Sequence, residues 1–162
     1  MMPPFRLKPW YIGIFTAGRW VTTYPWINVP KDTDPYYYSW ITAHESVHLV
    51  QQKDMGLYKW LWKYFTNRAF RLDQEAAGAA AEYWALIQAN RIPQQQWLDR
   101  YAEQYTNISY FWCAKSLEEG LAVLNQKIKD TTPVPVMASC HKILEPEVKA
   151  VKKPRKKRTP KE

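Results

Sequence analysis

The distribution of proline constrains the fold of this 162-residue chain more than any other feature of its sequence. Eleven of the 12 prolines lie before residue 39 or after residue 130, and Pro93 is the exception. Because proline interrupts helices and central strands, we expect long helices only between those limits. Gly56 and Pro93 divide this middle segment, and Ser39 and Asp73 offer helix-capping side chains. The pattern predicts five helices, over residues 40–52, 57–65, 75–90, 94–104 and 114–129.

Residues 1–38 have a different pattern, in which aromatic and β-branched residues form three short runs. These runs are Tyr11–Phe15, Trp20–Tyr24 and Trp26–Val29, and turn-forming residues separate them. Short runs of this composition between Gly and Pro are typical of β-strands. Hydrophobic residues make up 46% of the chain, which is enough to fill one core. The sequence therefore predicts an α+β fold with a small N-terminal antiparallel sheet followed by about five helices.

The positive charge of the chain is concentrated at its C-terminal end. Residues 149–162 hold eight basic residues and one acid, a net charge of +7, whereas residues 1–148 hold 15 basic and 14 acidic residues, a net charge of +1. A nucleic-acid-binding domain carries its positive charge on the folded body, and this body does not. We therefore predict a folded domain over residues 1–130, an extended segment over 131–148 and a basic, disordered tail over 149–162.

Two readings of that tail are equally consistent with its composition. It is either a solvated tail without a partner or a contact for nucleic acid or another polyanion, whose affinity would fall steeply with salt. The residues that would make this contact are Lys152, Lys153, Arg155, Lys156, Lys157 and Arg158.

Other features bear on the cellular compartment. No apolar run approaches the roughly 18 residues of a membrane-spanning helix, and the proline-containing N-terminal segment makes a poor secretory signal. Cys113 and Cys140 are too few for a disulfide scaffold, although they could form one bridge. These features favour the cytoplasm, or a virion if the chain is encoded by a phage.

Residues His44–His48 form an H-E-x-x-H motif on the first predicted helix and contain two of the three histidines in the chain. Side chains four residues apart lie one turn apart on the same helix face, so the two imidazoles can bind one metal ion. Glu45 would lie beside that ion, where its carboxylate can hold the attacking water and accept its proton. Zinc lowers the pKa of such a water and polarises the carbonyl under attack. The motif therefore predicts a Zn²⁺-dependent hydrolytic site.

A catalytic zinc ion needs a third protein ligand, and the sequence offers four candidates. Glu75 lies 27 residues after the motif, near the start of a helix that can pack antiparallel to the motif helix. Asp54 has the spacing of another metallopeptidase pattern, but Gln51 stands where that pattern requires Gly. Glu82 lies two turns after Glu75 and would also suit an outer role, and His141 is distant. The spacing favours Glu75 and leaves the others open.

On these residues the chain resembles a small gluzincin-type zinc metallopeptidase domain, and it is similar to poorly characterised bacterial and phage domains. Those domains place a strand pair before H-E-x-x-H-x-x-Q, then a Gly-x-x-x-aromatic helix and an acid-Ala helix. The matching segments here are residues 18–27, 43–52, 56–65 and 71–76, within a resemblance that covers residues 11–90.

The resemblance implies a role for each matching residue. His44, His48 and Glu75 would bind zinc, and Glu45 would act as the general base. An edge strand would hold an extended peptide or protein substrate by main-chain pairing, through Val21, Thr22 and Thr23. Many gluzincins also carry an acid four residues after the third ligand, to orient the first histidine.

The chain departs from that pattern because Ala79 occupies the position of the orienting acid. Glu82 or a backbone carbonyl would have to take that role. Gln51, three residues after His48, shares the face of the motif and could bond to a metal ligand or to substrate; a plain helix-end polar residue is the other interpretation. The alternative to a peptidase is a structural or interaction protein that retains the zinc site, such as a phage virion or secretion-apparatus component.

Overall fold

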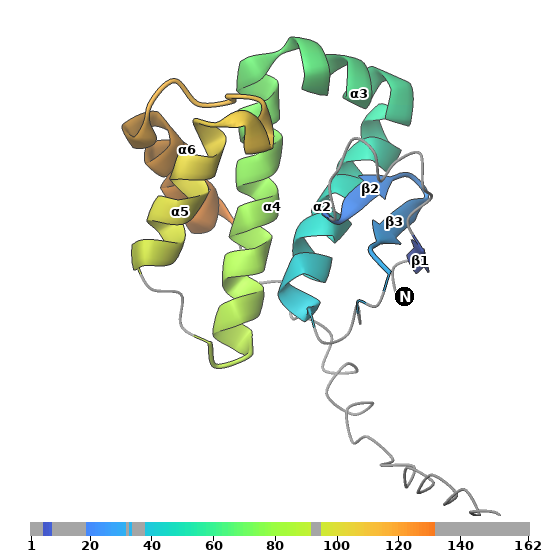
Figure 1. The fold of residues 1–162 in the computed structure, drawn as a ribbon, viewed down its shortest axis with the longest axis horizontal. Coiled ribbons are helices and arrows are strands. Elements are labelled where there is room, and N and C mark those ends of the chain that lie inside the picture. The colour runs from blue at the N-terminus through green and yellow to red at the C-terminus, as the bar shows by residue number, and fades with distance from the viewer. Residues whose placement is uncertain (1–4, 8–18, 32, 34–37, 92–94, 132–162) are drawn as a thin grey trace, which may run out of the picture.

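The computed structural model describes residues 5–7, 19–31, 33, 38–91 and 95–131. The predicted strand Tyr11–Phe15, Cys140, His141 and the basic tail lie outside these residues. In the described segments, a three-stranded sheet precedes five α-helices (Figure 1). This arrangement confirms the α+β prediction. The elements are β1 (Phe5–Leu7), β2 (Val21–Thr23), β3 (Trp26–Val29), α2 (Ser39–Met55), α3 (Leu57–Thr66), α4 (Arg68–Gln88), α5 (Gln95–Tyr105), the short 3₁₀ helix η1 (Ile108–Tyr110) and α6 (Leu117–Asp130).

The sheet has the strand order β1–β3–β2 and is mixed rather than wholly antiparallel. β2 and β3 form the predicted antiparallel pair, with Thr22 opposite Ile27. β1 pairs with β3 in parallel, with Phe5 opposite Ile27, and the sequence analysis did not anticipate this strand. Ile27 is fully buried at the centre of the sheet, so burial of its side chain stabilises both pairings.

Four helices begin and end within about three residues of the predicted positions, but α4 begins at Arg68 instead of residue 75, and the caps also differ from those expected. Ser39 is the first residue of α2, which starts without a side-chain cap. Asn67 rather than Asp73 caps α4, because its side-chain oxygen accepts a hydrogen bond from the backbone N–H of Phe70. Ser116 caps α6 through Glu119 N–H. Asn67 and Ser116 thus bond to N–H groups in the first turns of α4 and α6, whereas α2 begins without such a bond.

Helix α4 runs through the middle of the molecule and has elements packed on two sides (Figure 1). On one side lie α2 and the sheet, and on the other lie α5 and α6. The second side forms a hydrophobic core between the three helices. Its buried members are Leu72, Ala79, Tyr105, Cys113, Ala114 and Leu124. Among the described helices, none combines the length and the apolar character needed to cross a membrane.

Candidate metal centre

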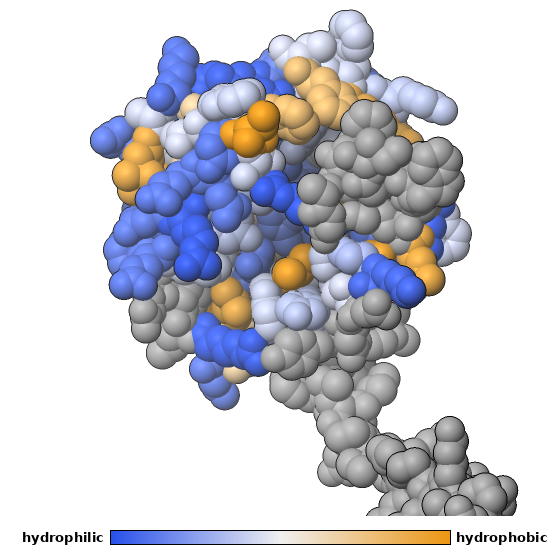
Figure 2. Space-filling view, viewed as in Figure 1, coloured by the Kyte–Doolittle hydropathy of each residue, from blue (hydrophilic) through white to orange (hydrophobic). Residues whose placement is uncertain are grey.

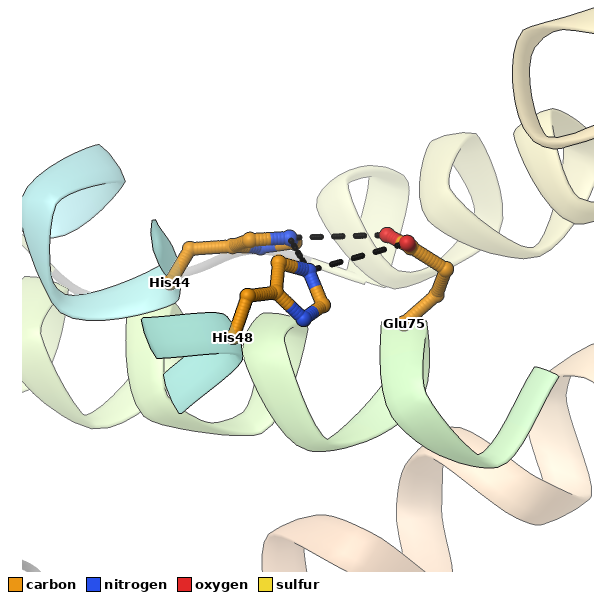
Figure 3. A group of neighbouring side chains, drawn as sticks. All are labelled: His44, His48 and Glu75. Atoms are coloured by element: carbon orange, nitrogen blue, oxygen red, sulfur yellow. Dashed lines mark hydrogen bonds and ion pairs between the residues drawn. The ribbon is translucent and has the colours of Figure 1, made fainter. Parts of the chain in front are cut away.

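His44, His48 and Glu75 meet between α2 and α4 (Figure 3). The Nε2 atoms of the two histidines are 3.1 Å apart. Nε2 of His44 lies 3.5 Å from Oε2 of Glu75, and Nε2 of His48 lies 3.6 Å from Oε1. The exposed fractions of the three residues are 6%, 6% and 4%. Two helices that are separate in sequence thus bring two imidazole nitrogens and one carboxylate to a single buried point.

The spacing of these atoms fits a tetrahedral zinc ion. With zinc–ligand distances of about 2.0–2.2 Å, any two ligand atoms of a tetrahedral site lie about 3.3–3.6 Å apart. The two Nε2 atoms are 3.1 Å apart, and each lies 3.5–3.6 Å from a different oxygen of the Glu75 carboxylate, close to that range. One ligand atom from each of the three residues lies within 4.8 Å of the others. Two histidines and a glutamate are also a known ligand set of catalytic zinc, which keeps a fourth position for water. The residues present therefore fit the ion that the motif predicted.

The outer nitrogen of each imidazole faces a side-chain oxygen. Nδ1 of His48 donates to Oε1 of Gln51 at 2.9 Å, and Nδ1 of His44 lies 3.5 Å from Oε2 of Glu82. A proton on each Nδ1 leaves the Nε2 lone pair free for a metal ion, so both contacts select the binding tautomer. Tyr101 of α5 donates its phenolic proton to Oε2 of Glu82 and fixes that carboxylate in turn.

Glu75 is held by an aromatic side chain from α3. The hydroxyl of Tyr64 donates to Oε1 of Glu75 at 2.6 Å. Burial, the charge of Glu75 and this hydrogen bond raise the pKa of Tyr64 well above its ordinary value of 10, so the phenol stays protonated and keeps donating. The two tyrosines, Tyr64 and Tyr101, thus orient one carboxylate each on either side of His44.

The buried carboxylates of the site need a positive charge beside them. Glu45, Glu75 and Glu82 are buried carboxylates around the two imidazoles. Without a metal ion the histidines supply the positive charge: burial alone would lower the pKa of His44, but Glu75 and Glu82 raise it to about 10. The pKa of Glu75 is lowered by both histidines, against the effect of its own burial. Metal ligands must be deprotonated, so a bound cation would replace these protons as the partner of the carboxylates.

Gly78 of α4 makes room for the first imidazole. A Cβ atom at this position would lie 2.7 Å from Nε2 of His44 and 2.8 Å from its Cδ2 atom. Only glycine therefore allows the metal-facing nitrogen of His44 to lie against the backbone of α4. The neighbouring Ala76, Ala79 and Ala80 are fully buried, so small residues surround Gly78 along α4.

Glu45, the predicted general base, bonds to the sheet. The Thr22 hydroxyl lies 2.7 Å from Oε2 of Glu45 and 3.0 Å from the main-chain oxygen of the same residue. Thr22 had been predicted to bind substrate through its main chain, and its side chain instead contacts the motif helix. This contact fixes the carboxylate of Glu45 against β2.

The outer edge of β2 already has a partner. The side-chain amide of Gln52, which is 1% exposed, donates from Nε2 to the oxygen of Thr22 and accepts from the backbone N–H of Tyr24 through Oε1. These are the groups that an extended peptide would use at this point. Substrate pairing here would have to displace Gln52. The flanking residues face elsewhere, because the oxygen of Val21 and the hydroxyl of Thr23 both accept from Asn28.

Of the other three ligand candidates, the structure describes Asp54 and Glu82, and neither belongs to the group that could hold a metal ion. Asp54 is exposed in the last turn of α2, Glu82 contacts the outer nitrogen of His44, and His141 is not described. The sequence analysis expected Gln51 to bond either to a metal ligand or to substrate, and in the structure it contacts His48, one of the predicted ligands. Sequence reasoning missed Tyr64, Tyr101 and Gln52 as partners of the site. Gly78 is the signal that the sequence did carry, because a glycine within an alanine-rich helix allows close approach of the motif helix.

Comparison with known proteins adds no family name to this geometry. No family model matches the chain, and neither the curated proteins nor the solved structures contain a match. The resemblance to gluzincins therefore stays a prediction from the motif. The geometry of the site is therefore the basis for a functional proposal.

Proposed function

We propose that this chain is a zinc-dependent metallopeptidase-like hydrolase that cleaves peptide bonds. The proposal is carried by one observation, the buried group of His44, His48 and Glu75, in which the two Nε2 atoms are 3.1 Å apart and each lies 3.5–3.6 Å from one oxygen of the carboxylate, a donor set that suits zinc. A zinc ion held there would activate a water molecule and polarise the substrate carbonyl. Hydrolysis of a peptide fits this chemistry because water is the nucleophile and the carbonyl is the electrophile.

The residues around the triangle have separate tasks in this reaction. Glu45 accepts a proton from the attacking water and delivers it to the leaving amine, so the carboxylate acts first as base and then as acid. Thr22 donates to Glu45 and restricts its rotation. Glu82 orients His44, because position 79, where many gluzincins carry the orienting acid, is an alanine here. Gln51 orients His48.

The test combines metal analysis with one isosteric substitution. Elemental analysis of the purified chain should find about one zinc per molecule. Glu45→Gln should retain this zinc but lower the hydrolysis of a peptide library by about 100-fold or more, because the amide accepts no proton from water. Glu103→Gln, a change at an exposed residue of α5, serves as the matched control and should keep both zinc and activity. A Glu45→Gln protein that cleaves at the wild-type rate contradicts the mechanism.

A structural zinc site without turnover is the second candidate, and two observations favour it. The ligands are almost completely buried, and the Gln52 amide occupies the edge of β2 that substrate would use. In that case zinc raises the free energy of unfolding, as any ligand of the native state does. Wild-type protein that binds stoichiometric zinc but cleaves no member of a peptide library supports this candidate over the peptidase.

A further inference from the structure

Two segments at one end of the molecule expose large aromatic side chains. The first is α3, and the second is the connection between α5 and α6, which includes η1. Phe65 of α3 meets Phe111 of the connection with ring centroids 6.0 Å apart, so the two segments form one surface. We call this surface the aromatic face. It consists of Tyr58, Trp62, Phe65, Phe111 and Trp112, which are 87%, 72%, 61%, 48% and 56% exposed.

The two sides of α3 carry aromatics for different purposes. Trp60 is buried against His48, and Tyr64 donates to Glu75, so the inner side belongs to the metal centre. Tyr58, Trp62 and Phe65 follow the spacing i, i+4, i+7 and therefore form a single stripe on the outer side. Burial in the folded chain accounts for the inner aromatics and does not account for this stripe.

Phe111 and Trp112 are held outward in an unfavourable backbone conformation. Their φ angles are 51° and 49°, in the left-handed region that bulky residues rarely adopt. Arg71, buried beneath the loop, donates to the carbonyl of Phe111 at 3.0 Å, and the backbone N–H of Trp112 donates to the oxygen of Asn107 at 2.9 Å. Two consecutive aromatics kept exposed against their backbone preference point to a role at the surface rather than in folding.

The charged side chains within the two segments of the aromatic face are of one sign, although Asp54 precedes the first segment and Glu118 and Glu119 follow the second. The two segments over residues 56–67 and 106–116 contain three lysines, Lys59, Lys63 and Lys115, and no acidic residue. Contact of this face with a second copy would bring six lysines together, which disfavours a symmetric dimer. Figure 2 shows pale and orange surface over the end of the molecule where α3 lies in Figure 1. Exposed Trp, Tyr and Phe beside lysines match the boundary between acyl chains and anionic headgroups.

We propose that the aromatic face docks the protein onto an anionic lipid membrane surface. The aromatic rings enter the boundary between headgroups and acyl chains, and the three lysines contact the lipid phosphates. The protein lies on the membrane without crossing it. The proposal does not require the metal centre, because His44, His48 and Glu75 are buried and the five residues of the aromatic face are exposed.

The test uses co-sedimentation of the full chain with phosphatidylcholine vesicles, with and without phosphatidylglycerol. Wild-type protein should bind the anionic vesicles more tightly. Trp62→Ser with Phe65→Ser should weaken this binding by about tenfold or more, since two aromatic contacts with lipid are lost. Phe111→Asn with Trp112→Asn should act similarly while tolerating the left-handed conformation. Brominated lipid should quench wild-type tryptophan fluorescence, and replacing Trp62 should reduce that quenching.

The controls separate the aromatic face from the basic tail and from general exposure. Leu7→Ser removes an apolar side chain that is 69% exposed on β1 and should leave binding unchanged. Lys59→Gln with Lys63→Gln should weaken binding only to anionic vesicles, whereas Lys129→Gln on α6 should not. Binding that the aromatic substitutions leave intact but removal of residues 149–162 abolishes assigns the contact to the tail and overturns the proposal. Absence of vesicle binding, or self-association through the face instead, also overturns it.

Discussion

The two sides of α4 face different kinds of interior. Towards α2 it presents Glu75, Gly78 and Glu82, which contact imidazole. Towards α5 and α6 it presents Leu72 and Ala79 to an apolar core. The apolar side stabilises the fold in every state of the protein, because burial of hydrocarbon needs no ligand. The polar side is stable only when a proton or a metal ion balances its buried carboxylates. One helix therefore separates a ligand-dependent region from a ligand-independent one.

Removal of the carboxylate ligand should produce the largest effect, on the ligand-dependent side. Glu75→Ala should lower zinc affinity by more than the roughly 100-fold that outer contacts contribute, because a direct ligand is lost. A competition titration against a fluorescent chelator measures the affinity. Asp54→Asn is the control, and it should leave the affinity unchanged. If Asp54→Asn weakens zinc binding instead, Asp54 rather than Glu75 completes the site.

A cavity on the other side of α4 should affect stability without affecting zinc. Leu124 is fully buried in the apolar core, so Leu124→Ala should lower the free energy of unfolding by about 2–5 kcal/mol. Urea denaturation with and without zinc measures this loss. Zinc should stabilise the variant and the wild type by the same increment, since distant sites act additively. An increment that differs by more than about 1 kcal/mol would show that the two sides of α4 are coupled.

A single methyl group on the ligand-dependent side should displace an imidazole. Gly78→Ala places a Cβ atom 2.7 Å from Nε2 of His44. Zinc affinity should fall about 100-fold, because the imidazole must move and is no longer oriented towards the metal position. Gly120→Ala is the matched change on the apolar side, where the new Cβ meets Ala102 at 3.3 Å. Isothermal titration should find normal zinc affinity in Gly120→Ala. Equal losses in both variants would indicate general disruption of helix packing.

Removal of one phenolic hydroxyl should have the smallest effect. Tyr101→Phe removes the donor that fixes Glu82, and zinc affinity should fall about tenfold because His44 is less well oriented. Tyr105→Phe is the control: within the described part of the chain the buried Tyr105 hydroxyl has no hydrogen-bond partner, so its removal should leave zinc affinity unchanged. The chelator competition distinguishes the two. A Tyr101→Phe protein with wild-type affinity excludes the proposed chain from Tyr101 through Glu82 to His44.

Local patterns made part of this architecture predictable. Proline spacing and helix periodicity indicated the helices, and four-residue spacing placed His44 and His48 on one face. Glu75 was expected near the motif because two helices joined by a helical connection can pack antiparallel, and it lies 3.5–3.6 Å from both imidazoles. Its role as a ligand stays a prediction, as does that of Glu45 as a base.

The remaining features depend on contacts between distant segments, which spacing along the chain does not reveal. Tyr101 reaches Glu82 from α5, and Tyr64 reaches Glu75 from α3. Strand β1 pairs with β3 in parallel although the two are about 20 residues apart in sequence. Asn67 and Asp73 are equally good capping residues by composition, and only the position of the backbone decides between them.

The amide of Gln52 acts as an intramolecular competitor for anything that would add to the sheet at β2. An incoming peptide must exchange two existing hydrogen bonds, those to Thr22 and Tyr24, for two new ones, so main-chain pairing at this point gives little net gain. Discrimination then falls to side chains, because only they can contribute contacts that the internal amide does not already provide. Extended chains whose side chains make no further contact should therefore bind weakly at this edge of the sheet.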